Sequence, residues 1–194
     1  MICALILAAG ESKRMGKQKL LLPFGRKTII ERIIENMKKS SVDETLVVLG
    51  ADKEKIEEKI KRFSLKIAFN PDFQKGMLSS VLCGLSACPE KARAVMIVLG
   101  DQPSIPVSVV ERLIRAYRKS GKGIILPVYK KNRGHPLLID LKYRKEIENL
   151  SPEIGLRQLV YSHSDDVFEV KVKTSAILRD IDNFEDYESE LKNN

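Results

Sequence analysis

Hydrophobic residues along the chain alternate between short continuous runs and longer stretches with a helical period. The continuous runs have the length of strands and are apolar at every position, so we expect strands that are covered on both faces, as in a parallel sheet. They lie at residues 3–7, 46–49, 66–69 and 94–99. The periodic stretches predict helices between these strands, at residues 28–37, 52–62, 77–87 and 106–117. This order predicts a doubly wound α/β sheet.

The pattern changes after Gly121. Two strand-like runs, at residues 124–129 and 135–139, are joined by a short polar segment, which is typical of a strand pair rather than of another strand–helix unit. Two short helices, two strands and a closing helix are expected beyond them, at residues 141–150, 154–161, 167–172, 176–181 and 182–191. No linker rich in Pro, Gly or Ser interrupts the chain. Residues 1–194 therefore predict one domain, with three layers and a mostly parallel sheet that contains a small antiparallel excursion.

The composition narrows the range of partners. The net charge is +8, but Lys and Glu are interleaved along the predicted helices, as at residues 53–59, which is typical of solvated helix faces. We interpret the excess positive charge as favouring solubility and a phosphorylated substrate. Binding to nucleic acid is not expected, because no recognised module is visible and aromatic residues make up only 6% of the chain.

The cysteines and the N-terminal residues indicate the cellular compartment of the protein. Cys3, Cys83 and Cys88 lack the spacing of a zinc site or a disulfide framework, so we expect reduced thiols. The first apolar run is too short to span a bilayer, and no basic leader or cleavage site precedes it. These features predict a cytoplasmic protein without a membrane partner.

The segment from Gly10 to Lys19 carries the first candidate chemistry. It follows the first predicted strand and holds two glycines, a serine and four cations. Such a loop lets backbone N–H groups approach phosphates and surrounds them with positive charge, so it predicts a nucleoside triphosphate site. The spacing fits neither the P-loop, because five residues separate Gly10 from Gly16, nor the dinucleotide fingerprint. A basic surface loop with turn glycines is the alternative interpretation.

Polar residues also follow later strands. Asp101 comes directly after the fourth predicted strand, where a carboxylate can hold Mg²⁺ against triphosphate oxygens or can simply cap a turn before Pro103. The hydroxyls of Ser79 and Ser80 lie at the start of a predicted helix, where they can bind a nucleotide or can cap the helix. Asp182 is either a second metal ligand or the N-cap of the closing helix.

A compact polar cluster, Arg133-Gly134-His135-Pro136, lies in the divergent part of the chain. Arginine can bind a phosphate through two parallel hydrogen bonds, which makes Arg133 a candidate for gripping a phosphorylated substrate. His135 either donates to that substrate or fixes the turn before Pro136. His163, in a run of Ser and Asp residues, is interpreted as an exposed loop residue.

Five segments, in this order and spacing, resemble the motifs of the molybdenum cofactor nucleotidyltransferases. They are Leu-Ala-Ala-Gly-x-Ser-x-Arg-Met-Gly-x-x-Lys from Leu7, Asn-Pro…Gly-Met-x-Ser-Ser from Asn70, Gly-Asp-Gln-Pro from Gly100, Arg-Gly-His-Pro from Arg133, and Asp-Ile-Asp-x-x-Glu-Asp-Tyr from Asp180. The match covers nearly the whole chain and is closest to the cytidylyltransferase branch. The guanylyltransferase branch usually begins Leu-Ala-Gly-Gly, from which Ala9 departs.

The resemblance implies a Rossmann-like nucleotidyltransferase fold and a Mg²⁺-dependent enzyme that transfers CMP from CTP to the terminal phosphate of molybdopterin, releasing pyrophosphate. Residues 1–120 would form the nucleotide-binding half, and residues 121–194 the acceptor-binding part with the closing strand and helix. The resemblance also implies a transient contact with a molybdoenzyme. It leaves the oligomeric state open.

The same resemblance assigns roles to residues of this sequence. Lys19, Arg14 and Asp101 would be catalytic, and Asp101 and Asp182 would hold Mg²⁺. Arg133, Gly134 and His135 would face the acceptor. The nucleotide would contact residues of the first two motifs, namely Leu7, Ala8, Ala9, Gly10, Ser12, Arg14, Gly16, Lys19, Asn70, Gly76, Ser79 and Ser80.

Two departures from the family pattern bear on the acceptor rather than on the triphosphate. Leu156 stands in Gly155-Leu156-Arg157 where relatives tend to have alanine, and Asn183 replaces a common threonine. One alternative is therefore nucleotidyl transfer to another acceptor, such as a sugar phosphate or methylerythritol phosphate. Another is transfer to molybdopterin with GTP as the donor. A non-catalytic accessory protein that binds the molybdenum cofactor and a nucleotide-binding oxidoreductase are the alternatives from other classes.

Overall fold

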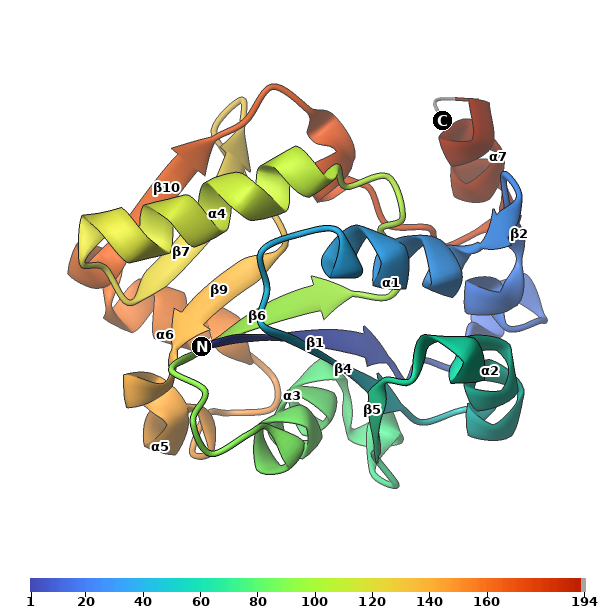
Figure 1. The fold of residues 1–194 in the computed structure, drawn as a ribbon, viewed down its shortest axis with the longest axis horizontal. Helices are drawn as coiled ribbons and strands as arrows, with labels where there is room; N and C mark the ends of the chain where they lie inside the picture. Colours follow the sequence, from blue (N-terminus) through green and yellow to red (C-terminus); the bar gives the residue numbers. More distant parts are fainter. Residues whose placement is uncertain (193–194) are drawn as a thin grey trace.

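The computed structural model of the chain describes residues 1–192, which fold around an eight-stranded sheet (Figure 1). Its order is β10-β7-β9-β6-β1-β4-β5, and β8 pairs with β7. The bounds are β1 (Ile2–Ala8), β4 (Glu44–Leu49), β5 (Lys66–Phe69), β6 (Ala94–Leu99), β7 (Ile124–Tyr129), β8 (Asn132–Arg133), β9 (Leu137–Asp140) and β10 (Val167–Lys171). A separate short hairpin joins β2 (Pro23–Phe24) to β3 (Lys27–Thr28).

Helices cover both faces of the sheet (Figure 1). On one face lie α1 (Ile29–Lys38), α2 (Lys53–Ile60) and α4 (Val107–Ser120). On the other lie α3 (Met77–Ala87), α5 (Arg144–Ile147) and α6 (Leu156–Ser162). The last described helix, α7 (Phe184–Lys192), packs beside the β2–β3 hairpin, where the Tyr187 hydroxyl donates to the carbonyl oxygen of Pro23 over 2.5 Å. Within residues 1–192, no helix is long and apolar enough to cross a membrane.

Strand β1 shows why the apolar runs are continuous. Successive side chains of a strand point to opposite faces of its sheet. Ile6 accordingly packs into the core beneath α1 and α4, whereas Leu5 packs into the core beneath α3 and α6. Every residue of β1 is buried. This confirms the prediction of coverage on both faces for β1, whereas the prediction is wrong for β5, the edge strand, in which Lys66 and Phe69 are exposed.

The register places the ends of three strands together. Strand β1 runs parallel to both β4 and β6, so that Leu7 pairs with Val48 and with Leu99. The loops that leave these strands therefore emerge at one edge of the sheet. Strand β9 runs antiparallel between β6 and β7, which confirms a mostly parallel sheet with an antiparallel excursion.

The predicted strand at residues 176–181 is wrong. The segment instead forms a 3-10 turn at Ser175–Leu178, followed by an extended connection to α7. The Thr174 side chain accepts a hydrogen bond from the Ala176 N–H, which starts the turn, and the carbonyl of Ile177 accepts from the His135 N–H. These hydrogen bonds hold the segment against residues 134–135, so it does not pair with a neighbouring strand of the sheet. The hairpin of β2 and β3 had no counterpart among the predicted elements, because two-residue strands have no readable periodicity.

Candidate functional site

The loop after β1 is held by its own side chains. Ser12 adopts the left-handed conformation, with φ 53°, and its hydroxyl donates to Gln18 Oε1 over 2.9 Å and accepts from the Lys19 N–H over 3.1 Å. The Gln18 amide donates to the carbonyl of Gly10 over 3.2 Å, which closes the loop. Gln18 is buried, and the sequence motif did not assign it a role. The loop is thus a fixed frame from which the Lys19 side chain extends.

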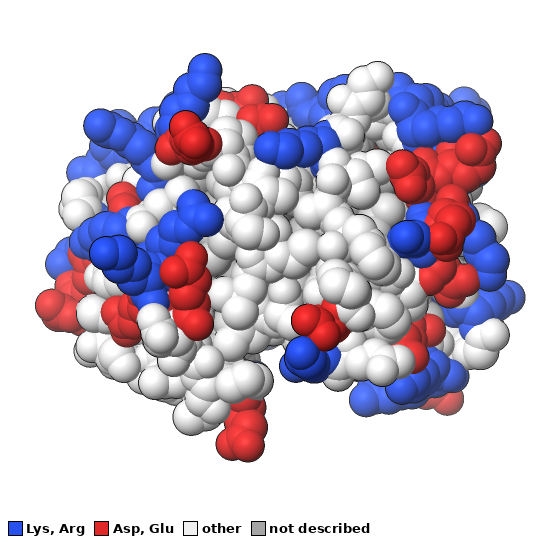
Figure 2. All heavy atoms as spheres, turned by 90° about the horizontal axis from the view of Figure 1, so that it is seen from below, with Lys and Arg blue, Asp and Glu red and all other residues white. Residues whose placement is uncertain are grey.

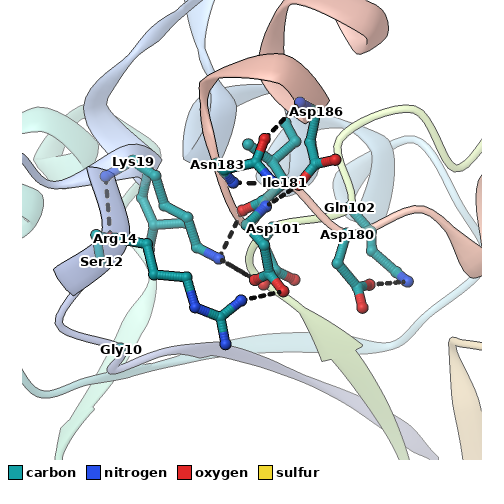
Figure 3. Close-up of polar contacts among 12 residues, drawn as sticks. Gly10, Ser12, Arg14, Lys19, Asp101, Gln102, Asp180, Ile181, Asn183 and Asp186 are labelled. Carbon is teal, nitrogen blue, oxygen red and sulfur yellow. Dashed lines mark hydrogen bonds and ion pairs between the residues drawn. The ribbon is translucent and has the colours of Figure 1, made fainter.

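Three segments that are far apart in the sequence meet at the side chain of Lys19 (Figure 3). Its ammonium nitrogen lies 2.8 Å from Asp101 Oδ2, 2.7 Å from the carbonyl oxygen of Ile181 and 3.4 Å from Asp182 Oδ1. The guanidinium of Arg14 donates to the other oxygen of Asp182 over 3.1 Å. The structure therefore brings together the residues to which the motifs assigned catalysis and metal binding.

The connection into α7 orients Asp182. Asn183 accepts a hydrogen bond from the Asp186 N–H over 2.9 Å, and the Asp186 carboxylate accepts from the N–H groups of Asp182 and Asn183. Asn183 and Asp186 thus satisfy the backbone groups at the start of the helix. The interpretation of Asp182 as the N-cap is wrong, because its side chain is directed instead to Lys19 and Arg14.

The donor set around Lys19 suits a magnesium ion. Asp101 and Asp182 are hard oxygen ligands, and one cation, the Lys19 ammonium, already bonds to both of them. No group of three or more His, Cys, Asp or Glu that could hold a metal occurs among residues 1–192. In proteins, Mg²⁺ usually binds to one or two carboxylates and completes its shell with substrate phosphates and water.

A cavity of about 390 Å³ opens beside this cluster, at the carboxyl ends of β1 and β6. Most of the predicted nucleotide contacts line it, namely Leu7, Ala8, Ala9, Gly10, Ser12, Lys19, Gly76 and Ser80, and so does Asp101, the predicted metal ligand. Arg14, Gly16, Asn70 and Ser79 lie outside this lining. A crevice at the carboxyl ends of strands is where open α/β sheets bind ligands. We refer to it as the nucleotide cavity.

Asn70 shapes the wall of the nucleotide cavity from behind. Its buried amide donates to the hydroxyls of Ser79 and Ser80, over 2.9 and 3.0 Å. Ser79 in turn donates to the carbonyls of Gly76 and Asp72. Neither serine caps α3, because the helix begins at Met77 with Gly76 as its N-cap and without a side-chain cap. Direct contact of Asn70 and Ser79 with a nucleotide stays a prediction.

A second cavity, of about 570 Å³, adjoins the first and shares Met77 and Leu99 with it. We refer to it as the acceptor cavity, because Arg133, Gly134 and His135 line it. Its other walls are mostly apolar, with Ile154, Leu156, Val160 and Tyr161 among the lining residues. Figure 2, which faces the side of the sheet covered by α3, α5 and α6, shows a band of uncharged residues between groups of charged ones.

Burial shifts the pKa of two groups in the acceptor cavity. Burial lowers the pKa of His135; the negative charge of Asp101 opposes this shift and the positive charge of Arg157 adds to it, and the net effect favours the uncharged imidazole. Burial also raises the pKa of Asp180, and the negative charge of Asp101 adds to this. Gln102 donates to Asp180 over 2.6 Å. The motifs that contain Gln102 and Asp180 were recognised, but neither residue was assigned a role.

Gly134 is required by a close approach of two backbones. A Cβ atom at this position would overlap the carbonyl oxygen of Ile177. We expect Gly134→Ala to lower the free energy of unfolding by about 2 kcal/mol, the usual cost of overpacking, and thereby to lower Tm by roughly 4 to 8 °C. Thermal unfolding followed by circular dichroism measures this. Gly10→Ala is the matched control, because a Cβ there meets nothing within 4 Å; a similar loss in both variants would contradict the role of the close approach.

The parallel strands, the loop after β1 and the two joined cavities define an open α/β protein with a crevice for a ligand at the carboxyl edge of its sheet. The sequence model of the MobA-like NTP transferase domain matches residues 4–167. The chain belongs to this family and is, by family, a nucleotidyltransferase.

Individual relatives were found by sequence and by structure. The chain is 32% identical to nicotine blue oxidoreductase of Paenarthrobacter nicotinovorans, over 80% of this chain and 79% of that protein. It is 26% identical to the molybdenum cofactor cytidylyltransferase of Escherichia coli, over 96% and 93%. The crystal structure of Rv0371c from Mycobacterium tuberculosis superposes with a TM-score of 0.89 and 25% identity, covering 98% of this chain and 97% of that one.

Proposed function

We propose that the protein transfers CMP from CTP to the terminal phosphate of molybdopterin that carries molybdenum, and releases pyrophosphate. The observation that carries the proposal is the pair of cavities that share Met77 and Leu99, because a two-substrate transfer needs donor and acceptor side by side. The relation to the E. coli cytidylyltransferase, over 96% of the chain, supports CTP and molybdopterin as the substrates. A cytoplasmic location and a transient contact with a molybdoenzyme belong to the same proposal.

The reaction joins two anions. An oxygen of the acceptor phosphate attacks the α-phosphorus of CTP, and the bond from that phosphorus to the oxygen bridging to the β-phosphate breaks as pyrophosphate leaves. Lys19 and Arg14 would offset the negative charge of the triphosphate, and the backbone N–H groups of the loop after β1 would bind its oxygens. Mg²⁺, held by Asp101 and Asp182, would supply further neutralisation of the phosphates. No enzyme nucleophile is needed.

The acceptor cavity fits a molecule with an apolar body and a phosphate. Arg133 and Arg157 line it and would attract the phosphate, and the uncharged His135 would donate a hydrogen bond without adding charge. Arg133 is already paired with Glu169, over 2.8 Å, so it would have to exchange this partner for the acceptor.

Stabilisation by nucleotides tests the donor side of the proposal. We expect CTP with Mg²⁺ to raise Tm by more than GTP, ATP or UTP at equal concentration, because only a ligand that binds the folded state stabilises it. Differential scanning fluorimetry of the intact protein measures this. A larger shift with GTP would contradict CTP as the donor, and equal shifts with all four nucleotides would contradict recognition of the base.

The relation to nicotine blue oxidoreductase gives a second candidate, an oxidoreductase, since this relative has the higher identity, 32% against 26%. Two assays on one preparation separate the candidates. Release of pyrophosphate with CTP, Mg²⁺ and molybdopterin supports the transferase, and a panel of other phosphorylated acceptors identifies a different acceptor. Redox turnover of nicotine blue, without release of pyrophosphate, would replace the proposal by the second candidate.

A further inference from the structure

The ammonium of Lys19 lies between the two carboxylates that are assigned to the metal. It bonds to Asp101 and Asp182 and to the carbonyl oxygen of Ile181, and Arg14 bonds to the remaining oxygen of Asp182 (Figure 3). Two carboxylates are therefore matched by two cations from the loop after β1. The same cations are the groups that a triphosphate would attract.

We propose that Lys19 and Arg14 are internal counter-ions that keep divalent cations off Asp101 and Asp182 until a nucleoside triphosphate draws both side chains onto its phosphates. The inference rests on the proposed function and deepens it, because it fixes the order in which this site takes nucleotide and metal. In this scheme the protein without nucleotide binds Mg²⁺ weakly. The nucleotide makes Asp101 and Asp182 available to the metal by drawing Lys19 and Arg14 away from them.

The ammonium and a divalent cation compete for the same oxygens. The Lys19 side chain is 14% exposed and that of Asp101 is 23% exposed, so solvent screens their charges only in part. A metal held by Asp101 and Asp182 would need the carboxylate oxygens to which the ammonium is now bonded, and two cations competing for the same oxygens repel each other strongly. Binding of the metal therefore requires that Lys19 leaves.

The structure allows Lys19 to leave without rearranging the loop. Its backbone N–H is held by the Ser12 hydroxyl over 3.1 Å, so the backbone stays while the unbranched side chain turns. Lys19 lines the nucleotide cavity, which brings phosphates in that cavity within its reach. Arg14, with a side chain that is 75% exposed, has still less to hold it in place.

Binding of nucleotide and binding of metal are coupled in this scheme. If the nucleotide raises the affinity for the metal by removing the counter-ions, the metal raises the affinity for the nucleotide by the same factor, because the two effects are linked. Removing the positive charge of Lys19 should then produce a gain: the free carboxylates should bind a divalent cation without any nucleotide.

The experiment measures binding of Mn²⁺ alone, by electron paramagnetic resonance of the unbound ion, to the intact protein without nucleotide. Lys19→Met keeps most of the side-chain length and removes the charge, and it should bind one Mn²⁺ at least about 10-fold more tightly than the wild type, the factor that corresponds to about 1.4 kcal/mol. Lys17→Met is the matched control, because it removes the same charge from the same loop at a residue that lies over the Phe184 ring. The Lys17→Met variant should bind Mn²⁺ with an affinity within about 2-fold of that of the wild type.

Two further variants complete the test. Asp182→Asn added to Lys19→Met should abolish the gain, which locates the ion at the carboxylates. Arg14→Met changes an exposed side chain and is therefore compatible with folding; it should give a smaller gain of roughly 3-fold. Unchanged affinity in Lys19→Met or, should that variant not fold, in Arg14→Met overturns the inference. So does an equal gain in Lys17→Met. Because no nucleotide is present, failure of CTP or molybdopterin as substrates would not alter these results.

Discussion

Lys19→Ala is expected to lower kcat/KM for nucleotidyl transfer by about 100- to 1,000-fold, the usual loss when a group that stabilises transition-state charge is removed. Its ammonium lines the nucleotide cavity and is the cation bonded to both Asp101 and Asp182. The loss should be dominated by kcat, because negative charge builds up on the leaving pyrophosphate during transfer. Release of pyrophosphate under saturating acceptor measures the two constants.

Lys17→Ala is the control for this prediction, since Lys17 is a cation of the same loop that does not line the nucleotide cavity. It should keep kcat/KM within about 3-fold of the wild type, as expected for a screened surface charge. Circular dichroism should show the same fold for both variants. Near-wild-type activity of Lys19→Ala would refute the assigned role of this side chain.

Asp101→Ala is expected to cause a loss of comparable size, about 100- to 1,000-fold in kcat/KM, because it removes one of the two carboxylates that would hold Mg²⁺. Raising the Mg²⁺ concentration should restore part of the lost activity, which a purely structural role would not predict. Turnover measured across a series of Mg²⁺ concentrations tests this. Asp165→Ala serves as the control, because Asp165 lies in the 3-10 turn Ser164–Asp166 and lines neither cavity.

The two substitutions should not be additive. Lys19 and Asp101 are 2.8 Å apart and act on the same triphosphate, so the double variant should lose far less than the product of the two single losses. Activity of the double variant equal to that product would mean that the two side chains act independently, contrary to a common magnesium–triphosphate site.

The sequence was sufficient for elements whose pattern is local. The run at residues 94–99 is the strand Ala94–Leu99, and the period at residues 77–87 is the helix Met77–Ala87. It was insufficient where tertiary contacts determine the secondary structure. Residues 176–181 are apolar enough for a strand, but the Ile177 carbonyl accepts a hydrogen bond from the His135 N–H and the segment joins no sheet. The position of β9 between β6 and β7 likewise depends on pairing across the whole sheet.

The candidate site likewise contains some residues that the sequence could identify and others that it could not. Glycines and charged residues of the motifs could be located in advance, because phosphate binding requires those residue types. Gln18 could not, since its amide acts through a hydrogen bond to Gly10 that exists only in the folded chain. Asn70 was located in advance as a nucleotide contact, but its hydrogen bonds to Ser79 and Ser80 could not be foreseen. Whether the individual residues touch nucleotide or acceptor stays a prediction.

Strand β9 lies between β7 and β6 in the described sheet, and so connects the part with β7 and β10 to the part with β6, β1 and β4. The register of β1 with β4 and β6 is set by pairs that involve no residue beyond Leu99. Insertions, deletions and substitutions in α5 and α6 (residues 144–162), whose hydrogen bonds do not involve the loop after β1, can therefore accumulate in descendants without disturbing that loop, whereas Ile181 and Asp182 are bonded to Lys19 and cannot change as freely. Evolution can in this way change the acceptor that the protein binds while the half that binds the nucleotide stays the same.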